Sequence, residues 1–286
     1  MHMNRSDVKI HKDRLRQIED HLRHSHDTMG VKRDAIGFVE VVHHPTYVLP
    51  ELNYVTPRRK TALVPGKHVE DGISSLRDHR RSARMLYVEE LFPSFFGQSL
   101  EKIGLSLEER FPLCVIDLSD PINAEPRFDN LSVQTVINQQ GIEIWSLVWR
   151  NAKYRVYGTP LEPLQIGKQY IHQNKVVDVI LYHHATPIAV ARLTIHNKTA
   201  HLMARALMRS TQPLHLHQWL IQVAAQTAIE QDCTLMFICD ADVEQLLSAS
   251  DLPCQQEGNM LCYTDSIDQP YGEETHDTVE QPLLLT

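Results

Sequence analysis

The alternation of apolar and polar residues is clearest in three neighbouring segments of the second half of the chain. Apolar side chains occupy every second position in residues 177–181, 189–195 and 202–208. Thr186-Pro187 and Asn197-Lys198 separate the segments with residues that favour turns. A period of two is that of a strand with one face toward a core, so these residues predict three antiparallel strands in sequence.

A helical pattern follows the three strands. Pro213 precedes a segment in which apolar residues recur every three or four positions, as expected for one face of a helix. Short apolar runs then predict a strand over 235–239, a helix over 243–249 and a strand over 259–263. Residues 176–265 therefore read as three strands, a helix, a strand, a helix and a final strand.

The first half of the chain has a similar mixture of elements. We expect helices over 6–24, 66–81 and 93–103, strands over 38–42, 85–88 and 113–118, and an irregular, Pro-rich connection over 45–66 with room for a strand. A polar segment punctuated by proline, 119–130, is the best domain boundary. Beyond it the pattern predicts a strand over 131–137 and helices over 142–152 and 161–173.

Two stretches of the chain resemble each other. Arg84–Glu89 matches Thr234–Cys239, and Leu113–Asp117 matches Met260–Thr264, with similar spacing between the strands. This repeat favours two related halves. We therefore predict a basic helical extension (1–33), a shortened first domain (34–118), a linker (119–130), a second domain (131–265) and an acidic, disordered tail (266–286).

Composition narrows the function classes. The chain has 286 residues, 42% hydrophobic and 22% charged, with a formal net charge of −8, which argues against a general nucleic-acid binder. No apolar run approaches the ~20 residues of a membrane span, and the basic N-terminus lacks an apolar secretory core. The five cysteines form no Cys-x-x-Cys pair, so reduced thiols in a cytoplasmic protein are the simplest expectation. The basic N-terminal helix is suited to docking on another subunit, which favours a homo-oligomer.

The 17 histidines raise the question of a metal site. Several lie in clusters: His21, His24 and His26; His43-His44; His183-His184; and His215-x-His217. A metal site needs three or four converging ligands, and none of these clusters has a Cys or acidic partner at a recognised spacing. We therefore expect solvated histidines and no metal site.

The order of elements resembles the GNAT superfamily of N-acetyltransferases, an α/β fold with a mixed sheet. The resemblance covers residues 131–265 in full and 38–117 as a shortened copy, so the chain resembles a tandem GNAT protein. Local likeness lies in Ile188–Ile195 with Ala200–Leu202, in Cys233–Ile238 and in Gly258–Tyr263. The resemblance implies acyl transfer from acetyl-CoA to an amine of a small molecule or peptide, with the cofactor between the fourth and fifth strands of the fold.

The residues that the resemblance requires for cofactor binding are missing. GNAT enzymes open the helix after the fourth strand with [Gln/Arg]-x-x-Gly-x-[Gly/Ala], whose backbone N–H groups bind the pyrophosphate. The corresponding residues 210–219 contain no glycine, and Pro213 lacks an N–H while Leu214 and Leu216 add bulk. Leu247 stands where family members often carry a general-acid tyrosine, and Asp251-Leu252 replaces the usual Gly-Phe.

Some site residues can still be assigned by position. His201 falls near the fourth-strand acid that deprotonates the amine in this family, although strand alternation alone would make it a solvent-facing polar residue. The acetyl-CoA contacts would come from the strand end and the helix start: Ala206, Leu207, Met208, His215, His217 and Gln218. In the first half, Gly66-Lys67 at a helix start, near Arg58–Lys60, offers a second place for a phosphate.

Two functions remain open on these observations. One is a GNAT-type N-acetyltransferase with an atypical cofactor loop. The other is a pseudoenzyme, a GNAT-fold binding or scaffold protein that has lost coenzyme A. No Gly-x-Ser-x-Gly, Walker, Gly-x-Gly-x-x-Gly or His-Glu-x-x-His motif supports a different chemistry.

Overall fold

A computed structural model describes residues 5–58, 63–119, 130–152, 154–155, 175–208, 213–239 and 254–265. The described strands form one twelve-stranded mixed sheet. Its order is β1-β2-β3-β4-β12-β5-β11-β10-β9-β8-β6, and β7 pairs with β10 beside this path. The mixed α/β class expected from the sequence is confirmed.

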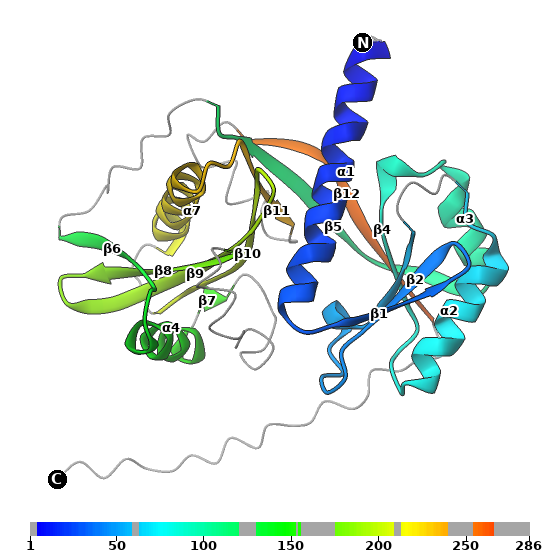
Figure 1. Ribbon diagram of the computed structural model, residues 1–286, viewed down its shortest axis with the longest axis horizontal. Coiled ribbons are helices and arrows are strands. Elements are labelled where there is room, and N and C mark those ends of the chain that lie inside the picture. The colour runs from blue at the N-terminus through cyan, green and yellow to red at the C-terminus, as the bar shows by residue number, and fades with distance from the viewer. Residues whose placement is uncertain are drawn as a thin grey trace.

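The predicted meander is present in the half drawn at the left of Figure 1. The strands β8 (Val176–His183), β9 (Thr186–His196) and β10 (Thr199–Leu207) pair antiparallel in sequence, and β6 (Leu131–Thr135) lies at the edge. The helix α7 (Pro213–Glu230) packs on one face of this sheet, and α4 (Gln139–Asn151) packs on the other. The helices expected over 161–173 and 243–249 lie outside the described residues.

The helix α4 begins at a side-chain cap. The Oδ1 atom of Asn138 accepts a hydrogen bond from the backbone N–H of Gly141 at 2.9 Å, which satisfies one of the N–H groups that a helix start leaves unpaired. Replacing Asn138 by Ala should lower the free energy of unfolding by about 1 kcal/mol, whereas Asn138→Asp should keep most of it. Urea unfolding measures both variants, and an unchanged midpoint for Asn138→Ala would show that the cap contributes nothing.

The other half of the sheet is built from shorter strands. The hairpin β1 (Lys32–Ile36) and β2 (Val39–His43) continues into β3 (Tyr54–Pro57), after the short 3-10 helix η1 (Pro50–Leu52). The helix α2 (Gly66–Asp78) leads to β4 (Arg84–Val88), which runs parallel to β3, and a second 3-10 helix, η2 (Glu89–Leu91), follows. The helix α3 (Phe95–Lys102) then packs beside α2 on the same core. The strand β1 was not expected from the sequence, because its five residues include three charged ones and have no buried face.

The two halves exchange their last long strands. The strand β5 (Leu105–Asp117) pairs with β11 (Leu235–Cys239) of the second half, and β12 (Cys254–Asp265) pairs with β4 of the first half. The two long strands also pair with each other along their whole length, from Cys254 opposite Ile116 to Asp265 opposite Leu105. The repeated sequence segments therefore occupy equivalent places around the centre of one continuous sheet.

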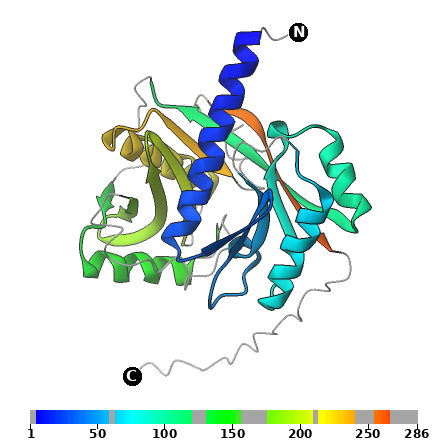
Figure 2. The ribbon, with the colours of Figure 1, turned by 45° about the vertical axis from the view of Figure 1, so that its right-hand side comes forward.

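The N-terminal helix α1 (Arg5–Thr28) lies across the centre of the sheet, between the two halves, in both views (Figures 1 and 2). Leu15, Ile18 and Leu22 are buried against β4, β5 and β11. Burying three large apolar side chains contributes roughly 1.5–3 kcal/mol each, so α1 is an integral part of the core. Among the described residues, no helix is both long and apolar enough to cross a membrane.

Candidate functional site

The strands β10 and β11 run parallel and then separate, as the acetyl-CoA-binding strands of the GNAT fold are expected to do. They pair only where Thr199, Ala200 and His201 lie opposite Leu235, Met236 and Phe237. The strand β10 continues six residues further, and its pairing with β9 shifts by one residue between Leu202 and Ala204. The predicted cofactor residues Ala206 and Leu207 lie on this diverging segment.

Another segment of the chain occupies the edge of β10 at this point. The two-residue strand β7 (Tyr154–Arg155) pairs antiparallel with β10, opposite Leu207 and Ala206. Main-chain groups that pair in a sheet cannot also bind a ligand on the same edge. The side chains of Ala206 and Leu207 are fully buried, and Met208 is half-buried.

His201, the predicted catalytic residue, is buried beneath α1. Its ring stacks on Phe237 with the centroids 4.6 Å apart, and its Nδ1 atom hydrogen-bonds Ser25 of α1 at 3.2 Å. Burial lowers the pKa of His201 to about 3, with a smaller contribution from His26, so the imidazole is neutral at pH 7. The solvent-facing alternative for His201 is wrong, because α1 covers this face of the sheet.

The same interface holds a network of polar side chains. His21 hydrogen-bonds Thr199 through Nδ1 at 2.5 Å and Thr194 through Nε2 at 3.0 Å. Ser25 hydrogen-bonds Thr194 at 2.6 Å. With both ring nitrogens bonded, His21 is fixed in place, and the pKa of His21 lies well below its usual value because of burial, chiefly, and neighbouring histidines.

The expectation of solvated histidines is therefore wrong for a large part of the set. Histidines that the structure shows as buried are His21, His26, His43, His44, His201 and His217. A neutral imidazole combines one donor and one acceptor, so it can be buried where partners are available. The sequence pattern did not show this, because the partners of His21, His26 and His201 come from other segments of the chain.

The first two turns of α7 hold the remaining predicted cofactor residues. His215 is exposed, whereas His217 and Gln218 are buried together with Leu216. Burial and, to a smaller extent, the nearby Arg205 lower the pKa of His217 to about 4, so His217 carries no positive charge for a phosphate at pH 7. Residues 209–212 and Leu247, Asp251 and Leu252 lie outside the described residues, and the assignments of these cofactor contacts stay predictions.

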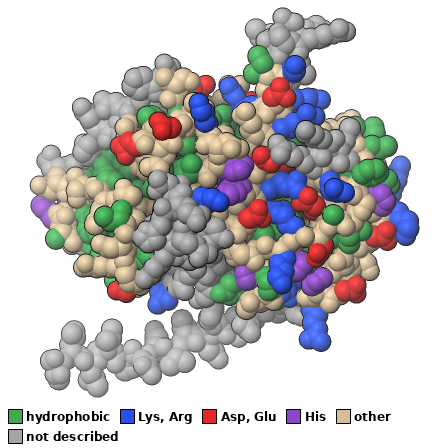
Figure 3. All heavy atoms as spheres, viewed as in Figure 1, with side chains coloured by type: hydrophobic (Ala, Val, Ile, Leu, Met, Phe, Trp, Pro, Cys, Tyr) green, Lys and Arg blue, Asp and Glu red, His purple; other side chains and the backbone are tan. Residues whose placement is uncertain are grey.

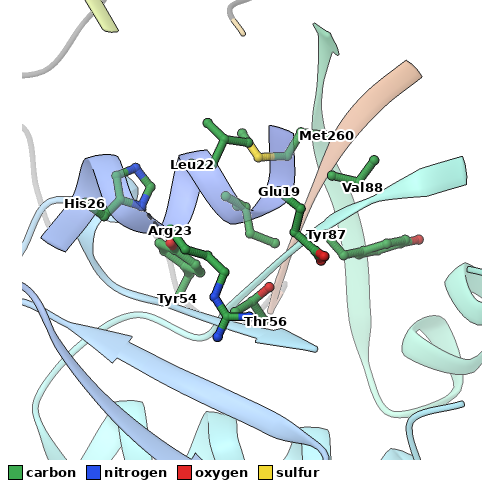
Figure 4. Close-up of a pocket in the computed structure, with 10 residues that line it drawn as sticks. Glu19, Leu22, Arg23, His26, Tyr54, Thr56, Tyr87, Val88 and Met260 are labelled. Atoms are coloured by element: carbon green, nitrogen blue, oxygen red, sulfur yellow. Dashed lines mark hydrogen bonds between the residues drawn. The ribbon is translucent and has the colours of Figure 1, made fainter. Parts of the chain in front are cut away.

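A second pair of parallel strands separates in the first half, where a small pocket opens (Figure 4). The strands β3 and β4 pair only at Val55 and Met85. The pocket that opens beyond this pair has a volume of about 30 Å³. Its lining comes from α1 on one side and from the sheet on the other: Glu19, Leu22, Arg23, His26, Tyr54, Thr56, Leu86, Tyr87, Val88 and Met260.

Three polar residues of this pocket have identified partners, of which Glu40 lies outside the lining. His26 Nδ1 and the Tyr54 hydroxyl are 2.6 Å apart, and Arg23 forms an ion pair with Glu40. Burial lowers the pKa of His26 to about 3 and raises the pKa of Tyr54 to about 12. Because the imidazole is neutral and the phenol is protonated at pH 7, Tyr54 donates this hydrogen bond or accepts one from Nδ1, and either way the pair is uncharged.

The alternative phosphate position at Gly66 is open at the start of α2. Lys67 there is exposed and forms an ion pair with Asp71 at 3.3 Å, one turn along the helix. Arg58 is also exposed, and its Nη1 donates to the Gly37 carbonyl at 3.1 Å. Arg59 and Lys60 lie outside the described residues.

The sequence did not predict that α1 lies against both halves of the sheet. One helix contributes His26 to the pocket of the first half, and His21 and Ser25 to the cover over His201 in the second half. The apolar face of α1 was visible in the sequence, but the partner of that face was not. Histidine and serine next to this apolar face were the available signal that the helix also buries polar groups.

Comparison with known proteins supports the same fold. The chain is similar to a GCN5-related N-acetyltransferase from Kribbella flavida, with a TM-score of 0.66 and 16% identity over 82% of this chain and 90% of that chain. It is also similar to a GCN5-related N-acetyltransferase from Sphaerobacter thermophilus, with a TM-score of 0.58 and 10% identity over 81% and 82%. A tandem GNAT protein from the clavulanic acid biosynthesis pathway matches with a TM-score of 0.50 and 12% identity over 79% and 77%.

No protein-family model matches the chain, and no curated protein matches it either. The structural likeness at these low identities establishes the fold alone. The chain has a GNAT fold and is similar to tandem members of that fold, as the order of elements predicted.

Proposed function

We propose that this protein is a GNAT-fold binding protein in which the second half no longer transfers acetyl groups. The observation that carries the proposal is the pairing of β7 with β10 at Ala206 and Leu207, on the edge that faces the gap between β10 and β11. Acetyl-CoA entering this gap would have to displace β7. In addition, the following helix begins at Pro213, and residues 210–219 contain no glycine.

The cover over His201 supports the same proposal. A general base needs a position within about 2.6–3.2 Å of the amine that it deprotonates. His201 instead contacts Ser25 of α1 and Phe237, and its low pKa makes it a poor proton acceptor at pH 7. An amine could reach this imidazole only after α1 had left the sheet.

The second candidate function is N-acetyl transfer from acetyl-CoA to an amine, with the cofactor held in the first half. The separation of the parallel strands β3 and β4 favours it, and the pocket of about 30 Å³ between α1, β3 and β4 would have to widen to admit the cofactor. The open start of α2 at Gly66, with Lys67 beside it, would then face the phosphates. Tyr54, protonated at pH 7, would be the available proton donor in that pocket.

Thermal unfolding with and without millimolar acetyl-CoA separates the two candidates. A ligand at ~100 times its dissociation constant adds about 2.7 kcal/mol to the free energy of unfolding, which is a visible shift of the midpoint. We expect no shift for this chain. A shift would contradict the proposal and support the acetyltransferase function.

Two variants would then locate the cofactor. Gly66→Val puts a branched side chain at the start of α2, where the backbone has an ordinary conformation and the nearest atom is Ile103 Cγ2, 3.4 Å from the added Cβ. The double variant His215→Ala/His217→Ala changes the start of α7. Loss of the shift in only the first variant would place acetyl-CoA in the first half, and loss in only the second would place it in the second half.

A further inference from the structure

The hairpin β1–β2 meets the C-terminal end of α2 at a cluster of three side chains. One ligand atom each from Asp34, His43 and His79 lies within 4.8 Å of the other two. The Nδ1 atom of His43 is 3.6 Å from Oδ2 of Asp34, and the rings of His43 and His79 are 4.1 Å apart between centroids. Figure 3 shows histidine, acidic and basic side chains together on the surface over this part of the molecule.

The backbone fixes the three residues in this arrangement. Asp34 lies opposite Val41 in the β1–β2 pairing, so Asp34 and His43 are diagonal neighbours on one face of the hairpin. His79 is the cap residue that directly follows Asp78, the last residue of α2. The helix closes there with two hydrogen bonds, from Arg80 N–H to the Arg77 carbonyl and from Arg81 N–H to the Leu76 carbonyl. Asp34 and His43 thus lie in paired strands, and His79 lies in the hydrogen-bonded turn that closes α2.

The hydrogen bonds of the two imidazoles leave ring nitrogens available. Nδ1 of His79 is 2.8 Å from the Ser75 carbonyl, which accepts only, so Nδ1 carries the proton and Nε2 keeps its lone pair. Nδ1 of His43 is buried and has no hydrogen-bond partner among the described residues.

We propose that Asp34, His43 and His79 bind a divalent transition-metal ion, with Zn²⁺ as the best match. Two imidazole nitrogens and one carboxylate are a known ligand set for zinc with a fourth position left to water. Zinc bonds of roughly 2.0–2.2 Å in a tetrahedron place ligand atoms about 3.3–3.5 Å apart. The observed 3.6 Å between His43 and Asp34 already approaches this separation, and His79 needs only a small movement.

The carbonyl of Ser75 supports the site as a partner of a ligand. Metal-ligating histidines usually donate their other N–H to a carbonyl or carboxylate, which fixes the tautomer and the ring.

Two positively charged side chains near the site repel a metal ion. Lys32 lies opposite His43 in the hairpin, and Arg81 donates to the His44 carbonyl and to Asn53 Oδ1. Their charge lowers the affinity below that of a closed, four-ligand structural site.

Bound metal would tie the hairpin β1–β2 to the end of α2, at the outer edge of the first half. This inference does not depend on whether the protein binds acetyl-CoA, because its residues belong to neither the β10–β11 gap nor the pocket beside α1. It also differs from the sequence expectation, since Asp34, His43 and His79 are separated by 9 and 36 positions and match no recognised metal-ligand spacing.

The test is a Zn²⁺ titration of the full chain after removal of metal with a chelator, in competition with a chromogenic chelator. We expect one tight equivalent. His79→Ala and Asp34→Asn should each weaken Zn²⁺ binding by more than ~10–100-fold. That is the loss expected when a residue that only hydrogen-bonds a metal ligand is removed. The matched control is His183→Gln/His184→Gln, an exposed pair with ring centroids 4.6 Å apart that forms no convergent group with a third ligand in the described part of the chain. The control should bind as tightly as the unmodified chain.

Cobalt gives an independent readout of the ligand set. Co²⁺ in a tetrahedral site of this kind should produce visible absorption bands, and Asp34→Asn should abolish them. Asp34 is exposed, so this variant should unfold at the same temperature as the parent chain when metal is absent. Absence of a tight equivalent, or unchanged Zn²⁺ affinity in both ligand variants, would overturn the proposal.

Discussion

Replacing Asp178 by Asn should lower the free energy of unfolding by about 3–5 kcal/mol, which is a large part of the stability of a domain. Asp178 and Arg192 form a two-pronged ion pair, with both N–O distances 2.7 Å, and each residue is at most 3% exposed. The Arg192 guanidinium also lies over the ring of Trp145, at 4.5 Å. The variant would remove the carboxylate charge that Asp178 presents to the buried guanidinium, and urea unfolding at constant m-value measures the loss.

Two comparisons show whether the loss comes from the buried charge. Glu89→Gln breaks the exposed pair between Glu89 and Arg110 and should cost at most about 1 kcal/mol. The double variant Asp178→Leu/Arg192→Met removes both buried charges and should recover much of the stability lost in Asp178→Asn. If Asp178→Asn proves no worse than Glu89→Gln, the pair does not hold β8 and β9 together as described.

Acid should weaken the docking of α1 more than it weakens an average interface. The folded-state pKa of His26 and that of His201 are each about 3, whereas an unperturbed histidine has a pKa near 6.5. Between these values the unfolded chain binds more protons, so stability is full above pH ~6.5 and falls as the pH decreases toward 3. At pH 4.5 the protonation of each histidine in the unfolded chain should have lowered the free energy of unfolding by on the order of 2–3 kcal/mol.

The pH dependence of urea unfolding tests this expectation. His201→Gln retains a hydrogen-bonding group for Ser25 but cannot be protonated, so its stability should fall by about 2–3 kcal/mol less between pH 7 and pH 4.5. The control, His183→Gln/His184→Gln, changes two exposed rings and should follow the unmodified chain. Parallel curves for His201→Gln and the unmodified chain would show that His201 does not titrate with unfolding.

Local pattern was sufficient for many of the elements. The alternation in β8, β9 and β10 and the helical period in α4 and α7 predicted those elements. The alternation did not show that both faces of the three strands are buried, one against α7 and the other against α4. The polar strand β1 was missed, and β5 was predicted over only its last residues. Residues 106–110 of β5 are all exposed, so they show no alternation between a buried and an exposed face.

The arrangement of the elements was harder to predict than their existence. Sequence order suggested that β5 closes the first half and β12 the second. Instead, β5 lies between β12 and β11 of the second half, and β12 lies between β4 and β5 of the first half. Antiparallel pairing between two long, similar strands satisfies either arrangement locally, so only the packing of the whole sheet selects one. The domain boundaries therefore remain a prediction.

Some features of the candidate site could likewise be predicted from the sequence, and others could not. The positions of His201 and of Ala206–Met208 on a diverging strand could be predicted, because they depend on the order of elements alone. The burial of His201 under α1 could not, because it depends on a contact between residues 176 positions apart. The convergence of Asp34, His43 and His79 was likewise hidden, since it arises where a hairpin meets the end of a helix.

A crystal structure of the full chain grown with an excess of coenzyme A tests most directly whether the cleft of the second half is filled by the protein itself. We expect β7 to remain paired with β10 at Ala206 and Leu207, with no cofactor density between β10 and β11. Density for coenzyme A in that gap, with its pyrophosphate at the start of α7 and β7 displaced, would contradict the account.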